Sequence, residues 1–107
     1  MAATEALPTE ETDTRTERQP PYAVVLHNDD VNTMDFVIAV LRVVFGYTAE
    51  RCVELMLEAH EKGRSVVWVG PLEVAELKAD QIKSCGPDPT RKDDGACTLG
   101  VTIEPAA

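Results

Sequence analysis

The chain has 107 residues, which suffices for one small domain, and a formal net charge of −9. This charge argues against binding to a nucleic-acid backbone or to an anionic membrane, because Lys and Arg supply most of the affinity for phosphate groups. It favours instead a basic partner or a positively charged ligand group.

Cysteine usage and hydropathy also exclude several classes of protein. The three cysteines, Cys52, Cys85 and Cys97, contain no Cys-x-x-Cys pair, so they predict neither a disulfide framework nor a zinc site. No apolar run approaches the roughly 18 residues of a membrane span, and the first residues match neither a secretory signal nor a transit peptide. We therefore expect a cytoplasmic protein with no metal, no cofactor and no membrane or nucleic-acid partner.

Residues 1–20 are rich in Glu, Thr, Ala and Pro and contain almost no large apolar side chain. Such a segment cannot bury enough surface to offset the entropy lost on ordering. We predict a disordered acidic arm over residues 1–20 and a folded domain over residues 21–107.

The first half of the domain predicts one strand and two helices. Residues Tyr22–His27 form an apolar run typical of a β-strand. Apolar residues at helical spacing follow over Met34–Phe45 and Ala49–Glu61. Gly46 and Gly63 end the two helices.

The second half predicts a strand over Ser65–Val69, a third helix that starts near Pro71, and a polar connector through Gly95. The last strand is predicted over Cys97–Ile103, with Gly100 as a bulge. The order β-α-α-β-α-β predicts an α+β fold, with a three-stranded antiparallel sheet and the helices on one face.

The most informative stretch joins the first strand to the first helix. Asn28, Asp29 and Asp30 follow the strand directly, and a cluster of acceptors without a nearby Lys or Arg suits a cation or an ammonium group. Met34 and Met56 offer adaptable apolar surface beside it. A free N-terminal Leu, Phe, Tyr or Trp would match both features, because it combines a positively charged amine with a bulky apolar side chain.

Two other hypotheses about the function remain open at this point. Asp29, Asp30 and His60 could serve a small metal-dependent hydrolase, although no His-Glu-x-x-His motif, activated nucleophile or glycine-rich phosphate loop accompanies them. The chain could also be a scaffold domain of the same topology that binds no ligand.

Three blocks of the sequence resemble the ClpS family of adaptors, which bring N-degron substrates to a Clp protease. They are Asn28-Asp29-Asp30-x-x-x-Met34-Asp35-Phe36-Val37, Leu55-Met56-Leu57-x-Ala59-His60-x-x-Gly63 and Glu73-Val74-Ala75-Glu76-x-Lys78. The resemblance runs from about Tyr22 to Ile103 and implies a non-enzymatic adaptor of the bacterial cytoplasm, with a plastid as the alternative.

The resemblance also implies roles for individual residues. Asn28, Asp29 and His60 would hold the substrate's α-amino group, directly or through water, which leaves Asp30 to hold the turn. The pocket for the first side chain would be lined by Leu26, Asn32, Met34, Val37, Met56 and Ala59, with Met34 as a gate and Asn32 at the rim, where many relatives have Thr. Glu73 and Lys78 would contact the N-terminal domain of a Clp AAA+ unfoldase, and the arm would help to transfer the substrate.

Overall fold

The computed structural model describes residues 20–106. Along the chain, the elements are β1 (Tyr22–His27), α2 (Met34–Phe45), α3 (Ala49–Lys62), β2 (Arg64–Gly70), α4 (Leu72–Ser84), the 3-10 helix η1 (Pro89–Asp94) and β3 (Val101–Pro105). The predicted disordered arm, apart from Pro20, lies outside the described residues and stays a prediction.

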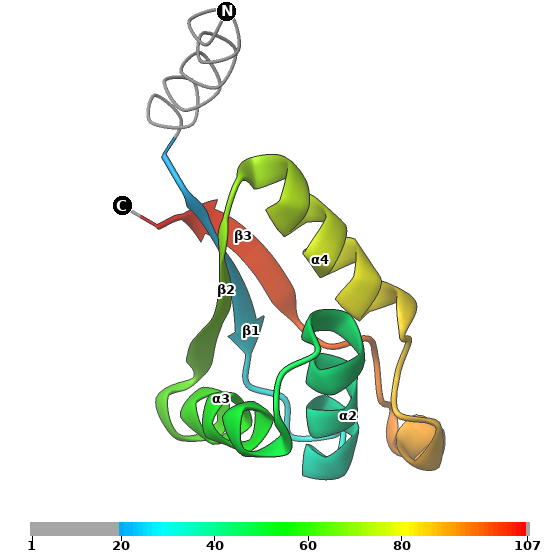
Figure 1. Ribbon diagram of the computed structural model, residues 1–107. Helices are drawn as coiled ribbons and strands as arrows, with labels where there is room; N and C mark the ends of the chain where they lie inside the picture. Colours follow the sequence, from blue (N-terminus) through cyan, green and yellow to red (C-terminus); the bar gives the residue numbers. More distant parts are fainter. Residues whose placement is uncertain (1–19, 107) are drawn as a thin grey trace, which may run out of the picture.

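The three strands form one antiparallel sheet in the order β2-β1-β3, so the predicted α+β fold is confirmed. Helix α4 lies alongside the sheet, and α2 and α3 gather at the end of β1 where that strand leads toward α2 (Figure 1). The loop after β1 therefore lies between α2, α3 and the segment that follows α4.

The core forms where the apolar faces of the helices meet the sheet. From β1, Val24 and Leu26 are almost completely buried, and they pack with apolar residues of all three α-helices. The helix ends follow the local sequence: Thr33 and Thr48 cap the starts of α2 and α3 through their hydroxyls, and Gly46 ends α2 at φ +72°. Helix α2 has its predicted bounds, and α3 extends one residue further than predicted.

The predictions for the last strand were wrong in two respects. Strand β3 begins at Val101 rather than Cys97, and the connector before it contains the 3-10 helix η1.

Gly100 is no bulge; the irregularity lies in β2, where Val24 pairs with Trp68 but Val25 pairs with Val66. Val67 is therefore the extra residue of β2 at this bulge. Because of the bulge, Val67 and its neighbour Trp68 both contact the core, which simple alternation along a strand would not allow.

Among the described residues, no helix is long and apolar enough to cross a membrane.

The ring of Trp68 lies directly over Gly70, so a Cβ at residue 70 would be 2.2 Å from the ring. We expect Gly70→Ala to displace the ring and to lower the free energy of unfolding by about 1–3 kcal/mol. Urea denaturation measures this loss, and fluorescence reports directly on the ring because Trp68 is the single tryptophan of the chain.

Gly100→Ala is the matched control, because a Cβ there meets only the Cβ of His27, at an ordinary 3.5 Å. If the two variants are equally stable, the contact between Trp68 and Gly70 does not constrain the fold.

Candidate functional site

Asp29 closes the loop between β1 and α2. Its Oδ1 accepts the backbone N–H groups of Val31 (2.8 Å) and Asn32 (2.9 Å), which makes a local turn, and its Oδ2 accepts the side-chain amide of Asn32. Partial burial acts to raise the pKa of the Asp29 carboxyl, but the hydrogen bonds from Asn32 and Val31 outweigh it and hold the pKa below its usual value. The turn therefore belongs to Asp29, not to Asp30 as the sequence had suggested.

Asn32 connects this turn to the segment after α4. Its side chain is only 5% exposed, and its Nδ2 donates both to Asp29 and to the carbonyl of Cys97 (2.8 Å). Its Oδ1 accepts the backbone N–H of Asp88 at 2.8 Å. Asn32 lines the pocket, but it is buried and both ends of its amide are bonded inside the protein, so it is not an exposed polar group at the rim.

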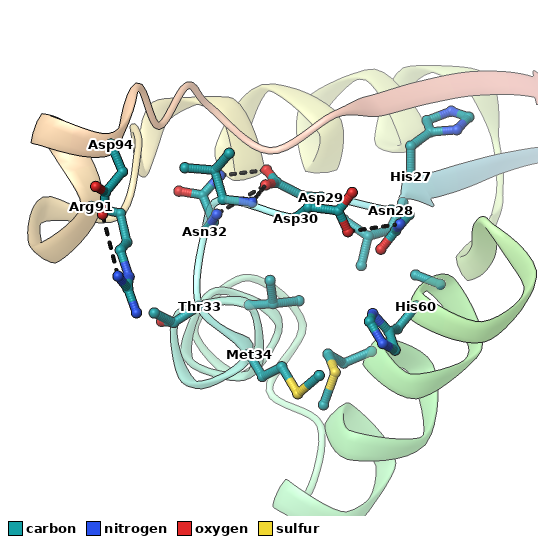
Figure 2. A pocket seen from close by; sticks show the side chains of 15 residues that line it. His27, Asn28, Asp29, Asp30, Asn32, Thr33, Met34, His60, Arg91 and Asp94 are labelled. Carbon is teal, nitrogen blue, oxygen red and sulfur yellow. Dashed lines mark hydrogen bonds and ion pairs between the residues drawn. The ribbon is translucent and has the colours of Figure 1, made fainter.

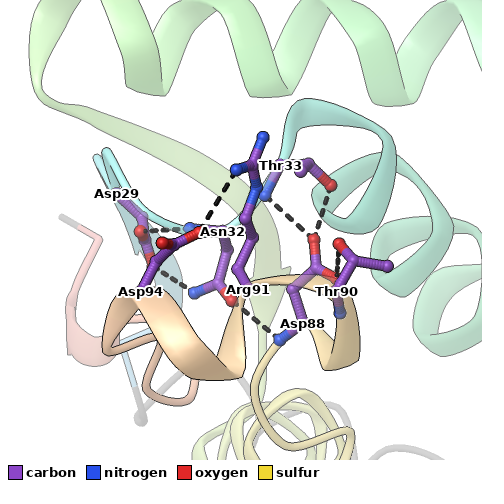
Figure 3. Close-up of polar contacts among 7 residues, drawn as sticks. All are labelled: Asp29, Asn32, Thr33, Asp88, Thr90, Arg91 and Asp94. Carbon is purple, nitrogen blue, oxygen red and sulfur yellow. Dashed lines mark hydrogen bonds and ion pairs between the residues drawn. The ribbon is translucent and has the colours of Figure 1, made fainter.

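Asp88 completes the connection from the other side (Figure 3). Its Oδ2 accepts the N–H (3.1 Å) and the hydroxyl (2.6 Å) of Thr33, and its Oδ1 accepts the N–H (2.9 Å) and the hydroxyl (2.7 Å) of Thr90. Hydrogen bonds from Thr33 and Thr90 hold the pKa of the Asp88 carboxyl far below its usual range, against the opposing effect of burial. One buried carboxylate thus joins the start of α2 to the start of η1.

The loop, α2, α3 and η1 enclose a pocket with a volume of about 600 Å³ (Figure 2). This volume lies within the range of roughly 300–1,000 Å³ that is typical of small-ligand sites. All nine residues predicted for the amine and the first side chain line it: Leu26, Asn28, Asp29, Asn32, Met34, Val37, Met56, Ala59 and His60.

The pocket has a polar end and an apolar wall. Asn28 and His60 lie at one end, with Asp30 beside them, and the Asn28 Nδ2 donates to the Asp30 Oδ1 at 3.3 Å. The backbone N–H of Asn28 also donates to the carbonyl of Gly63 at 3.0 Å, which holds the loop against the end of α3 near His60.

The apolar wall combines buried and exposed groups. Leu26, Val37, Met56 and Ala59 are buried, whereas Met34 is 47% exposed at the edge of the pocket. The pocket can therefore hold a cationic group at one end and a bulky apolar group next to it.

The two residues predicted to contact an unfoldase lie away from this pocket, on α4. Glu73 is exposed in the first turn of the helix. The ammonium of Lys78 donates to the carbonyl of Val44 (3.0 Å) and lies 5.6 Å from the centre of the Phe45 ring. Lys78 therefore already has a structural role, since it caps the C-terminal end of α2.

Within residues 20–106, no three His, Cys, Asp or Glu side chains gather closely enough to hold a metal ion.

The family model described as ATP-dependent Clp protease adaptor protein ClpS matches residues 17–88. The ATP-dependent Clp protease adapter protein ClpS of Edwardsiella ictaluri is 47% identical over 77 residues, covering 70% of this chain and 73% of that protein. The protein of the same name from Synechococcus sp. (strain ATCC 27144) is 40% identical over 85 residues, covering 78% of this chain and 93% of the other.

The chain belongs to the ClpS family. The resemblance found in the sequence is thus confirmed, and the relatives named here are bacterial proteins called Clp protease adapters. Among solved structures, ClpS2 of Agrobacterium tumefaciens bound to L-phenylalaninamide has a TM-score of 0.69 and 35% identity, covering 80% of this chain and 96% of that one.

Six residues that line the pocket of this ClpS-family protein were not assigned to the amine or to the first side chain from the sequence: His27, Asp30, Val31, Thr33, Arg91 and Asp94. Of these, Asp30 had been placed in the acceptor cluster after the first strand and then assigned to the turn. Arg91 and Asp94 lie in η1, beyond the end of the family match at residue 88. The sequence does contain a signal for η1, because an Asp before a Pro is a common start of a helix and Asp88 indeed caps η1. That signal could predict the short helix, but not its place beside the pocket.

We expect Asp88→Ala to lower the free energy of unfolding at pH 7, because the N–H and hydroxyl donors of Thr33 and Thr90 lose their buried acceptor. A carboxyl whose pKa is depressed on folding stabilises the folded state above its unfolded value, about 3.9, and this contribution is lost progressively as the pH falls further. The stability difference between the wild type and Asp88→Ala should therefore shrink below about pH 4, as measured by urea denaturation across pH.

Asp93→Ala is the control, since Asp93 is an exposed acid of the same short helix. A stability difference for Asp88→Ala that stays constant down to pH 2 would show that the Asp88 carboxylate is not held in its charged form by folding.

Proposed function

We propose that this ClpS-family protein is a non-enzymatic adaptor of the bacterial cytoplasm. It binds proteins that begin with a bulky apolar residue (Leu, Phe, Tyr or Trp), through the free α-amine and the first side chain. It then delivers them to a Clp AAA+ unfoldase for degradation. The observation that carries the proposal is the pocket itself, in which an acceptor-rich end adjoins an apolar wall.

We assign the substrate's amine to Asn28, Asp30 and His60. The exposed Asp30 carboxylate accepts only a long hydrogen bond from Asn28 among the described residues, so it is available to an ammonium. The C-terminal end of α3, where His60 lies, carries the partial negative charge of the helix dipole and favours a cation.

Asp29, to which the sequence assigned the amine, supports this site indirectly. Both of its oxygens already accept hydrogen bonds from Val31 and Asn32. We therefore propose that Asp29 holds the loop in the shape that presents Asn28 and Asp30, while its remaining charge adds to the negative potential of the site.

The first side chain would lie against Leu26, Val37 and Met56, with Met34 as a flexible gate at the edge. Ala59 is small and buried, so it leaves depth at this wall for Phe or Trp. The solved relative with L-phenylalaninamide supports this assignment, because that ligand combines an amine with a bulky apolar side chain.

The magnitudes agree with binding that is specific but reversible. A charge-assisted hydrogen bond contributes about 1.5–3 kcal/mol, and burial of one Leu or Phe side chain contributes about the same. Several such terms, less the cost of immobilising the peptide, correspond to a dissociation constant in about the micromolar range.

The deciding experiment compares peptides that begin with Leu, Phe or Trp before and after N-acetylation. Acetylation removes the positive charge and two N–H donors, so we expect binding to weaken at least roughly tenfold in fluorescence anisotropy titrations. Equal affinity for the free and acetylated peptides would exclude the proposed amine site.

Asp30→Asn and Asp94→Asn are matched variants for the same titration, because both replace an exposed carboxylate at the pocket by an amide. With a peptide that has no charged side chain, Asp30→Asn should weaken binding about 10- to 100-fold, whereas Asp94→Asn should change it little.

For delivery, we propose that Glu73 and Lys78 on α4 contact the N-terminal domain of the unfoldase and that the arm, residues 1–20, assists the transfer. Lys78 has three N–H donors and uses one on Val44, so it can still donate to a partner. Since Lys78 also stabilises the end of α2, Glu73 is the cleaner residue to vary.

We expect Glu73→Arg to weaken capture by the unfoldase while peptide binding stays unchanged, as measured by pull-down and by anisotropy. Glu50→Arg is the control, because it reverses another exposed acid in the first turn of a different helix, α3. If both variants capture the unfoldase as well as the wild type does, the delivery surface does not include Glu73.

A further inference from the structure

One wall of the pocket comes from the 3-10 helix η1, which the family match does not include. Arg91 and Asp94 of η1 both line the pocket, and the Arg91 Nη1 lies 3.2 Å from the Asp94 Oδ2. Their side chains are 50% and 59% exposed. Both charges therefore lie at the rim of the pocket, not in its interior.

The rim is held firmly in relation to the other end of the pocket, where Asn28, Asp30 and His60 lie. Asp88, at the start of η1, accepts hydrogen bonds from Thr33, and the carbonyl of Cys97, beyond the end of η1, accepts one from Asn32. The N–H of Ala96 also donates to the carbonyl of Arg91 at 3.2 Å, which closes the end of the short helix. Arg91 is thus presented by a segment that is tied to the β1–α2 loop on both sides.

Arg91 is the only Lys or Arg among the described residues that line the pocket, and it faces an otherwise acidic lining of Asp29, Asp30 and Asp94. Figure 2 shows it at the opposite end of the pocket from Asn28 and His60. Of the five N–H donors of its guanidinium, one is directed to Asp94, through a half-exposed ion pair that water and salt weaken. The remaining donors are available to a ligand.

A bound peptide would pass this rim as it leaves the pocket. If the α-amine is held near Asn28 and the first side chain covers the apolar wall, each following residue advances by roughly 3.3–3.6 Å. The side chains directly after the first residue are therefore the first that reach an exposed charge at the rim.

We propose that Arg91 is a specificity-determining residue that lets the pocket accept an acidic side chain directly after the substrate's first residue. The proposal rests on the proposed function of the same pocket. Without Arg91, an acidic side chain would meet only acids of the lining in a protein whose net charge is −9. Arg91 offsets this repulsion and can bond the carboxylate through two of its N–H groups.

The test uses three free-amine peptides that start with Phe and differ only in the second residue: Glu, Gln or Lys. Each is titrated by fluorescence anisotropy at low salt against the wild type, Arg91→Gln and Arg91→Glu. We expect the affinity ratio of the Glu peptide to the Lys peptide to fall roughly two- to fivefold in Arg91→Gln, and further in Arg91→Glu. The Gln peptide should bind all three proteins alike.

Lys92→Gln is the matched control, because Lys92 is the neighbouring exposed cation of η1 and does not line the pocket. The same ratio in the wild type and both Arg91 variants, or an equal fall in Lys92→Gln, would overturn the role of Arg91. If the Gln peptide still binds and its N-acetylated form does not, that result leaves the proposed function intact. If no free-amine peptide binds, the proposed function fails and this inference fails with it.

Discussion

The hydrogen bonds from Asp29 through Asn32 to Asp88 are the constraint on which the site depends. They join the loop after β1 to a segment 56 residues further along the chain. Because Asn32 and Asp88 are almost inaccessible to water, solvent cannot replace a bond that is lost, and each partner needs the others. The pocket walls formed by the loop and by η1 are therefore positioned together.

The same bonds explain how a short polar loop can present a precise arrangement of acceptors. Thr33 donates its hydroxyl to Asp88 and accepts the N–H of Phe36, so one side chain both ends the loop and starts α2. Asn28, at the other end of the loop, is held to the end of α3. A site that is rigid before the ligand arrives loses less entropy on binding, which leaves more of the interaction energy for recognition.

Negative and positive charges lie at opposite ends of the pocket. The end of the pocket at Asn28 and His60 combines the Asp30 carboxylate with the negative end of the α3 dipole, whereas the opposite rim holds Arg91. The first end lies within residues 17–88, which the ClpS family model matches, and the rim comes from the connector after them. The two ends of the pocket are therefore supplied by parts of the chain on either side of residue 88.

The sequence by itself determined the order of the main helices and strands, the bounds of α2 and the nine pocket residues that the structure brings together. The helices and strands follow from local signals, namely apolar periodicity and capping residues, whereas the nine pocket residues follow from the resemblance to the ClpS family. Only the tertiary structure decided that Asp29 holds the turn, that Asn32 is buried, that β3 starts at Val101 and that η1 carries Arg91 to the rim. The turn at Asp29 is local, but the burial of Asn32, the start of β3 and the place of η1 depend on contacts between segments far apart in the chain, such as the bond from Asp88 to Asn32. Such partners meet only when the whole domain has folded.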